Sequence, residues 1–243
     1  MAPIKALLFD VFGTVVDWRR CVAGEIDAMA KKYGIEVDAA EIADAWRAEY
    51  QPAMEEIRAD RRPFDILDIL HRENLDRVLA RFNLDQISID DRDELNLAWH
   101  RLQGWPDSAE GLKALKRRFI LATQSNGNIA LIVNMAKGAD LAWDVVLGAE
   151  VTGYYKPCPQ AYDRACAALG LPNEACMMVA AHNDDLFAAR QQGMRTAFVC
   201  RPAEHGPNQT KDLTPEADWD YVATSFIDLA AQLKMLEKLY YYL

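Results

Sequence analysis

The sequence has few cysteines, no long apolar run and no excess of positive charge. Its five cysteines are odd in number and widely separated, with no Cys-x-x-Cys pair, which argues against a disulfide framework and a zinc site. No apolar run approaches the roughly 20 residues that cross a bilayer. Lys5 interrupts the short N-terminal apolar run, so a signal peptide is not expected. We therefore expect a soluble, cytoplasmic protein with reduced cysteines and no membrane contact.

The charge balance is acidic. The chain has 27 lysine and arginine residues against 37 aspartate and glutamate residues, which gives a formal net charge of −10. This balance disfavours nonspecific binding to nucleic acid or to an anionic membrane, although a local positive patch can still bind a small anion. At 243 residues, the chain can form one large α/β domain or a domain that carries an insertion.

The first structural signal is the apolar run from Ala6 to Phe9, which predicts a buried β-strand. This strand delivers one carboxylate, Asp10, to a turn marked by Gly13. A carboxylate at such a place can be a nucleophile, a metal ligand or a helix cap. Its role depends on the side chains that the rest of the chain brings to it.

The remaining chain divides into two patterns. Residues 18–96 show apolar side chains at helical spacing, including Ile42, Trp46, Tyr50 and Met54 at every fourth position. From Trp105 onward, short apolar runs alternate with helical stretches. The expected strands are 119–123, 145–149, 177–181 and 196–200, and the expected helices are 108–116, 128–137, 159–169 and 185–192.

This alternation predicts an α/β fold with a doubly wound, mainly parallel, Rossmann-like sheet and right-handed crossovers. The strand at residues 6–9 would join that sheet, which makes the helical block an insertion after the first strand. We expect an α/β core domain formed by residues 1–17 and 97–243, and an all-helical cap domain formed by residues 18–96. Asp10 would lie in the cleft between the two domains.

Polar residues follow the expected strands at the edge where open α/β sheets bind ligands. They are Asp10 and Thr14, then Ser125 and Asn126, then Lys156, and finally His182, Asn183, Asp184 and Asp185. Each group alone has an ordinary explanation as a turn, a helix cap or a solvated charge. Their coincidence at equivalent strand positions predicts a functional site.

Four segments carry a family resemblance: FDVFGT at residues 9–14, TQSNG at 123–127, YYKP at 154–157 and VAAHNDD at 179–185. In this order they resemble the haloacid dehalogenase superfamily over essentially the whole chain. The first segment continues as FDVFGTVVDW, which is similar to the type II 2-haloacid dehalogenase branch. The resemblance implies the α/β fold of that superfamily with an inserted helical cap.

Phe12 decides between two chemistries of this superfamily. Its magnesium-dependent phosphatases carry a second aspartate two positions after the nucleophile, where this chain has Phe12. A phenyl ring can neither protonate a leaving alkoxide nor add charge around a metal, whereas chloride and bromide leave without a proton. The resemblance therefore implies hydrolysis of small 2-haloalkanoic acids to 2-hydroxy acids, without a metal or cofactor. Chloroacetate and 2-chloropropionate are the expected substrates, with fluoroacetate as a further candidate.

The resemblance also implies residue roles. Asp10 attacks the halogen-bearing carbon and forms an ester, which water then opens at the Asp10 carboxyl carbon. Lys156 keeps Asp10 ionised. Asp185 matches the aspartate that activates or positions the hydrolytic water. His182 departs from the family pattern, in which asparagine holds this place, and as a neutral imidazole it would share the role as a base or relay.

Further residues are expected to hold the substrate. Ser125, Asn126 and backbone N–H groups near Thr14 would orient its carboxylate. From the cap, Arg47 would meet the anionic substrate or the departing halide, although a solvated helix arginine is an alternative. Tyr162 matches a site tyrosine of the branch, and its alternative is aromatic packing under a helix. Phe12 would help to keep the site dry.

Two other functions stay open. One is a magnesium-dependent phosphatase or phosphonatase that uses Asp184 and Asp185 as metal ligands. The other is a non-catalytic binding protein, which the joint presence of Asp10, Lys156 and Asp185 disfavours. The expected partners are a small haloacid and the released halide, without nucleic acid, and the resemblance adds a homodimer as a further expectation.

Overall fold

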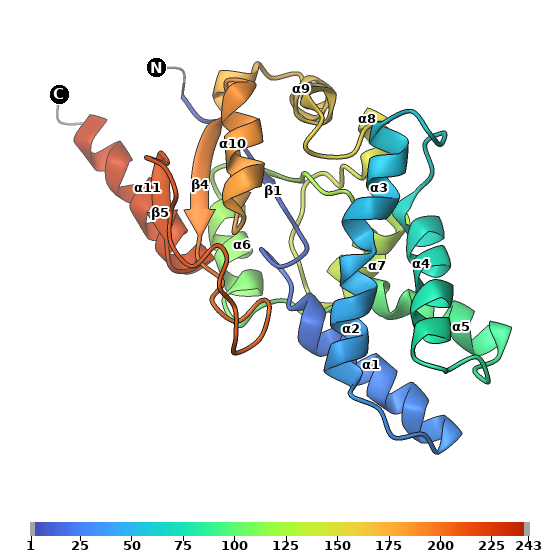
Figure 1. The fold of residues 1–243 in the computed structure, drawn as a ribbon. Coiled ribbons are helices and arrows are strands. Elements are labelled where there is room, and N and C mark those ends of the chain that lie inside the picture. The colour runs from blue at the N-terminus through green and yellow to red at the C-terminus, as the bar shows by residue number, and fades with distance from the viewer. Residues whose placement is uncertain (1–2, 241–243) are drawn as a thin grey trace.

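A computed structural model describes residues 3–240 of the chain (Figure 1). In these residues five strands form one parallel sheet in the order β2-β1-β3-β4-β5. The strands are β1 (Ala6–Phe9), β2 (Ile120–Thr123), β3 (Cys176–Ala180), β4 (Arg195–Val199) and β5 (Tyr221–Ala223). β1 is central, since Leu7 pairs with Leu121 on one side and with Met177 on the other. The predicted parallel α/β fold is confirmed.

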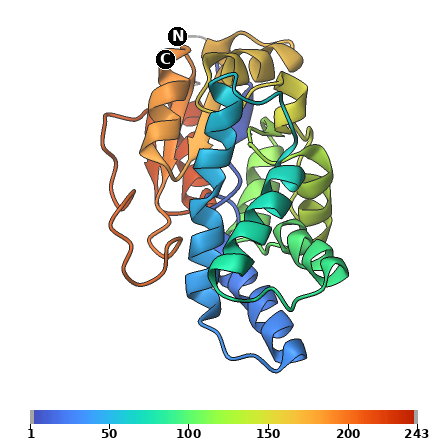
Figure 2. The same cartoon turned by 45° about the vertical axis from the view of Figure 1, so that its right-hand side comes forward.

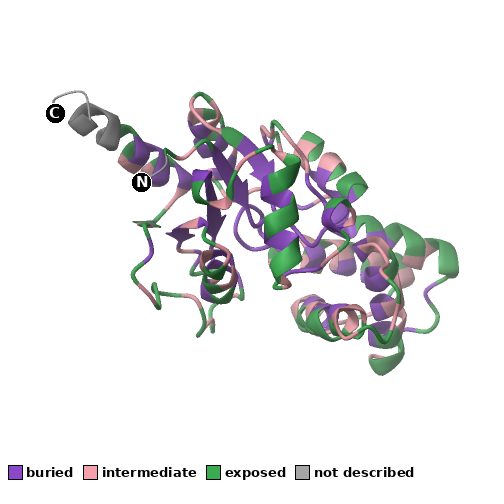
Figure 3. Cartoon of the chain, turned by 90° about the horizontal axis from the view of Figure 1, so that it is seen from above, coloured by how far each residue is buried: buried purple, intermediate pink, exposed green. Residues whose placement is uncertain are grey.

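The sheet is buried on both faces, as a doubly wound fold requires. Successive residues of β1 point to opposite faces: Leu7 and Phe9 belong to one hydrophobic cluster, and Ala6 and Leu8 belong to another. The covering elements are α6 (Ser108–Lys116), α7 (Ile129–Gly138), α8 (Ala149–Thr152), α9 (Pro159–Ala168), η2 (Asn173–Ala175), α10 (Asn183–Gln191) and α11 (Phe226–Tyr240). Figure 3 shows most strand residues as buried and the outer helix faces as exposed.

The predicted strands differ from the structure in two places. The segment 145–149 was expected to be a strand, but it makes only one bridge, between Val145 and Ala122 of β2. The side chain of Asp144 accepts from the Leu121 N–H at 3.0 Å, and α8 begins at Ala149, so no ladder extends along this edge. β5 was not predicted, because it has three residues and its central Val222 is exposed.

An all-helical block lies between β1 and β2 in the chain, as expected. Its elements are α1 (Trp18–Tyr33), α2 (Ala39–Ala48), α3 (Tyr50–Arg58), α4 (Leu67–Arg81), α5 (Ile89–Asn96) and the 3₁₀ helix η1 (Leu97–His100). The block lies on the opposite side of the molecule from β5 and α11 (Figure 1). Figure 2 shows the long loop between β4 and β5 beside this block. In the described residues, no helix combines the length and apolar character needed to cross a membrane.

The four-residue pattern through α2 and α3 predicted buried side chains correctly but not the break between the helices. Ile42, Trp46, Tyr50 and Met54 are all buried. The helix nevertheless divides at Glu49. Pro52 explains the break, because proline has no N–H and its ring clashes with the carbonyl four residues earlier.

A close helix contact in the core gives a stability test. A methyl group at Gly111 of α6 would lie 2.3 Å from Cβ of Phe226 in α11, whereas one at Gly24 of α1 would meet no heavy atom within 4 Å. We expect Gly111→Ala to lower the free energy of unfolding by about 1–3 kcal/mol, through overpacking. The control Gly24→Ala should raise it by about 0.5–1 kcal/mol, because alanine favours a helix interior. Urea denaturation measures both, and an unchanged Gly111→Ala midpoint would contradict this packing.

Candidate active site

The site begins where β1 ends. The Asp10 N–H donates to the Val179 carbonyl at 3.0 Å, which anchors the residue at the sheet edge. Gly13 then turns the chain with φ of +84°, a conformation that favours glycine. A methyl group at this position would also lie 2.0 Å from Oε1 of Glu204. The turn therefore requires glycine for both its backbone angle and its close approach to Glu204.

Three donors hold the buried carboxylate of Asp10. Its Oδ2 accepts from the hydroxyl of Thr14 at 2.6 Å and lies 3.0 Å from Nδ1 of His182. Its Oδ1 accepts from Nζ of Lys156 at 2.9 Å. Burial alone would raise the pKa of Asp10, but Lys156 and His182 outweigh burial and hold this pKa well below its usual range. Asp10 is therefore an anion at neutral pH.

Lys156 lies between two carboxylates. Its Nζ donates to Asp185 as well as to Asp10, and Tyr162 donates its hydroxyl to Oδ1 of Asp185 at 2.6 Å. Burial would lower the pKa of Lys156, but the two carboxylates raise it. Burial raises the pKa of Asp185, and Lys156 only partly offsets this effect. Asp185 is thus a stronger base than an ordinary aspartate.

His182 also lies between two carboxylates. Its Nδ1 faces Asp10, and its Nε2 lies 2.9 Å from Oε2 of Glu204. Because each ring nitrogen faces a carboxylate acceptor, the geometry favours a ring that carries hydrogen on both nitrogens. Burial would lower the pKa of His182, but Glu204 and Asp10 raise it well above its ordinary value. The raised pKa favours an imidazolium over the expected neutral imidazole.

Glu204 is a member of the site that the sequence analysis missed. It lies in the loop after β4, is 1% exposed and accepts from Nε1 of Trp18 at 3.1 Å. Burial would raise its pKa, but His182 lowers it below the usual range. The residue stands 22 positions after its partner His182, in a loop without periodicity, so no sequence pattern identified it.

A cavity of about 640 Å³ opens onto these groups. Its wall includes Asp10, Phe12, Arg47, Tyr50, Arg58, Asn126, Lys156, Tyr162, His182, Asp184, Asp185 and Glu204. The guanidinium of Arg47 lies 4.0 Å from the centre of the Tyr50 ring. Its Nη1 is buried and has no hydrogen-bond partner among the described residues. Phe12 packs edge-on against Tyr50 and Trp99. The cavity therefore combines an aromatic wall with a cation that has an unused donor.

Two predicted site residues lie behind the cavity wall. Thr14 donates to Asp10 and accepts from the Ala181 N–H at 2.8 Å. Ser125 accepts from the Gly127 N–H at 3.0 Å and so closes its turn. Asn126 does line the cavity, and its side-chain oxygen accepts from the Lys156 N–H at 2.8 Å. Direct substrate contacts by Thr14 and Ser125 stay predictions.

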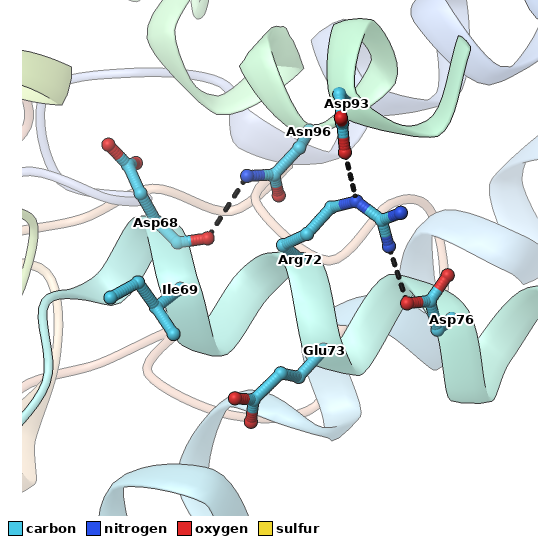
Figure 4. A pocket seen from close by; sticks show the side chains of 7 residues that line it. All are labelled: Asp68, Ile69, Arg72, Glu73, Asp76, Asp93 and Asn96. Atoms are coloured by element: carbon cyan, nitrogen blue, oxygen red, sulfur yellow. Dashed lines mark hydrogen bonds and ion pairs between the residues drawn. The ribbon is translucent and has the colours of Figure 1, made fainter. Parts of the chain in front are cut away.

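A second cavity of about 370 Å³ lies against α4 and α5 (Figure 4). Its wall consists of Asp68, Ile69, Arg72, Glu73, Asp76, Asp93 and Asn96. Arg72 forms ion pairs with Asp76 and Asp93, each at 2.6 Å. Asp68 and Glu73 are paired with His100 and Arg62. Because these charges bind one another, this cavity lacks the free cation found beside Asp10.

The buried aspartate at a strand end, its lysine partner and the helical block over the cavity define a hydrolase-type site of an α/β protein. A family model described as haloacid dehalogenase-like hydrolase matches residues 4–193. The chain belongs to this family.

Solved structures and a characterised relative give the same family. A defluorinating L-2-haloacid dehalogenase is 50% identical, covers 95% of each chain and superposes with a TM-score of 0.94. A second L-2-haloacid dehalogenase is 44% identical, covers 96% of this chain and 99% of that chain, and gives a TM-score of 0.93. (S)-2-haloacid dehalogenase 4A of Burkholderia cepacia is 30% identical over 87% of this chain and 94% of its own length.

The charge on His182 can be tested through Glu204. We expect Glu204→Gln to lower the pKa of His182 toward its ordinary value, because one of two carboxylates is removed. Histidine NMR titration, with His182→Asn to assign the signal, measures this shift. An unchanged titration in Glu204→Gln would contradict the assigned pair.

The same pair has a signature in stability. The pKa of His182 is higher in the folded than in the unfolded protein. Its interaction with Glu204 therefore stabilises the fold fully below the unfolded pKa of about 6.5, and this stabilisation is lost as pH rises through the folded pKa. The wild-type advantage over Glu204→Gln should therefore shrink as pH rises above about 6.5.

Proposed function

We propose that the protein hydrolyses small 2-haloalkanoic acids to 2-hydroxy acids through an ester on Asp10. One observation carries this proposal: the anionic Asp10 shares a cavity with Arg47, whose Nη1 has no protein partner. An ionised nucleophile and a free cation suit a substrate that is an anion and releases an anion. Similarity to L-2-haloacid dehalogenases at 44–50% identity supports the same activity.

In the proposed first step, a carboxylate oxygen of Asp10 attacks the halogen-bearing carbon. The carbon–halogen bond breaks in line with the attack, and the halide leaves with the bonding electron pair. Arg47 offers its free N–H to the substrate anion or the halide. The Phe12 and Tyr50 rings limit water around the nucleophile, which strengthens these electrostatic interactions.

In the proposed second step, water attacks the carboxyl carbon of Asp10. We assign proton acceptance to Asp185, because burial raises the pKa of this carboxyl, whereas the raised pKa of His182 favours its protonated form. Nζ of Lys156 and Nδ1 of His182 lie against the two Asp10 oxygens and would stabilise the oxyanion that forms there.

The proton balance then closes through Asp10 itself. The departing alkoxide takes the proton from Asp185 and leaves as the hydroxy acid. Asp10 is left protonated and ionises readily, because Lys156 and His182 hold its pKa low despite its burial. Each turnover therefore consumes one water and releases one halide and one proton.

The packing of the site favours this chemistry over a magnesium-dependent phosphatase. Phe12, at the position of the phosphatase acid, is buried against Trp99 and supplies no proton. The two oxygens of Asp185 are already bound by Lys156 and Tyr162. Asp184 accepts from the Asp185 N–H at 2.7 Å. The ammonium of Lys156, which binds both Asp10 and Asp185, occupies the space between these two carboxylates.

We propose further that residues 18–96 act as a cap domain over a core domain of residues 1–17 and 97–243. Arg47 and Phe12 come from these two parts and line one cavity, which supports the division. A cytoplasmic location agrees with the five free cysteines. The homodimer is proposed from the family resemblance.

The direct test is halide release from L-2-chloropropionate, chloroacetate and fluoroacetate in the presence of EDTA. We expect wild-type protein to release halide from at least one acid at a rate that EDTA does not change, and Asp10→Asn to release none. Absence of halide from all three acids would contradict the proposal. Magnesium-dependent cleavage of an aryl phosphate, by wild type but not by Asp10→Asn, would support the phosphatase instead.

A further inference from the structure

The loop that carries Lys156 is held by the helical block at two points. Arg58, near the end of α3, donates from Nη1 to the Lys156 carbonyl at 3.0 Å. Tyr155 donates its hydroxyl to the Asp65 carbonyl at 2.6 Å, and its ring lies 5.3 Å from that of Phe64. The backbone around Lys156 is therefore held by α3 and by the loop between α3 and α4.

The core holds the same residue from the other side. The Lys156 N–H donates to Asn126, and its Nζ donates to Asp10 and Asp185. Its carbonyl is thus bound by the helical block, its amide by the core, and its ammonium by the two carboxylates of the site. A shift of the backbone at the carbonyl would move the base of the side chain whose ammonium is bound by Asp10 and Asp185.

Arg58 and Arg47 both line the cavity, but their guanidinium groups differ in how they are bound. In Arg47, Nη1 has no partner. In Arg58, Nε donates to Glu55 at 2.9 Å, Nη1 donates to Lys156, and Nη2 donates to Oε1 of Gln51 at 3.2 Å. The Arg58 side chain is only 13% exposed. Arg58 is therefore bound as a structural residue, whereas Arg47 keeps a donor for a ligand.

We propose that Arg58 is a positioning residue that couples the placement of α3 to the placement of Lys156 between Asp10 and Asp185. This inference rests on the proposed function for its effect on rate. Correct seating of α3 fixes the Lys156 carbonyl, and through it the ammonium that both proposed steps use. Loss of the hydrogen bond from Arg58 to the Lys156 carbonyl should therefore affect the chemical steps more than substrate binding.

The test compares Arg58→Gln with three other variants in haloacid turnover. Arg58→Gln should lower kcat about 10- to 100-fold, since small misplacements of reacting groups have effects of this size, with KM changed by less than about threefold. Arg58→Lys should recover part of the loss, because it keeps one donor. Arg61→Gln should match wild type, since Arg61 is exposed and its side chain pairs with Glu56. Arg47→Gln should instead raise KM.

Hydrogen exchange gives a readout that does not depend on activity. The peptide containing Lys156 should exchange faster in Arg58→Gln than in wild type or Arg61→Gln, with similar melting temperatures for all three. Unchanged exchange and unchanged kcat in Arg58→Gln would overturn the inference while leaving the proposed function intact. If wild type releases no halide, the proposed function fails. The exchange comparison alone then supports or overturns the role of Arg58 in positioning Lys156.

Discussion

The structure of the site depends on the buried ammonium of Lys156 between Asp10 and Asp185. Buried charges are costly unless they are paired and hydrogen-bonded. Lys156 satisfies two carboxylates, and His182 satisfies Asp10 and Glu204. These pairs keep the buried Asp10 carboxylate ionised, although burial alone would raise its pKa. The donors that keep Asp10 ionised also fix the position of its two oxygens at the cavity.

The same charges explain why distant segments meet at this point. Glu204 arrives from the loop after β4 and binds both His182 and Trp18, the first residue of the helical block. Arg58 returns from that block to the carbonyl of Lys156. The sheet edge thus supplies the Asp10 carboxylate, while the inserted block supplies Arg47 to the same cavity and binds the loop that carries Lys156. Neither part contains the whole site.

Sequence patterns predicted what depends on local periodicity and chain order. The apolar runs identified four of the five strands in the described residues. The expectation that polar residues after parallel strands lie together correctly predicted that Asp10, Lys156 and Asp185 meet. The run at 145–149 misled because apolar residues can pack beside an edge without a ladder. The charge of His182 could not be predicted, since it is set by Glu204, a partner in an irregular loop.

The central claim is that Asp10 becomes covalently bound to the substrate. A single turnover in ¹⁸O-water, with enzyme in excess over a haloacid, tests it most directly. The account predicts that the heavy oxygen enters the Asp10 carboxylate, seen by mass spectrometry of the peptide, while the first hydroxy acid formed carries none. Label in the hydroxy acid on the first turnover, with unlabelled Asp10, would contradict the account.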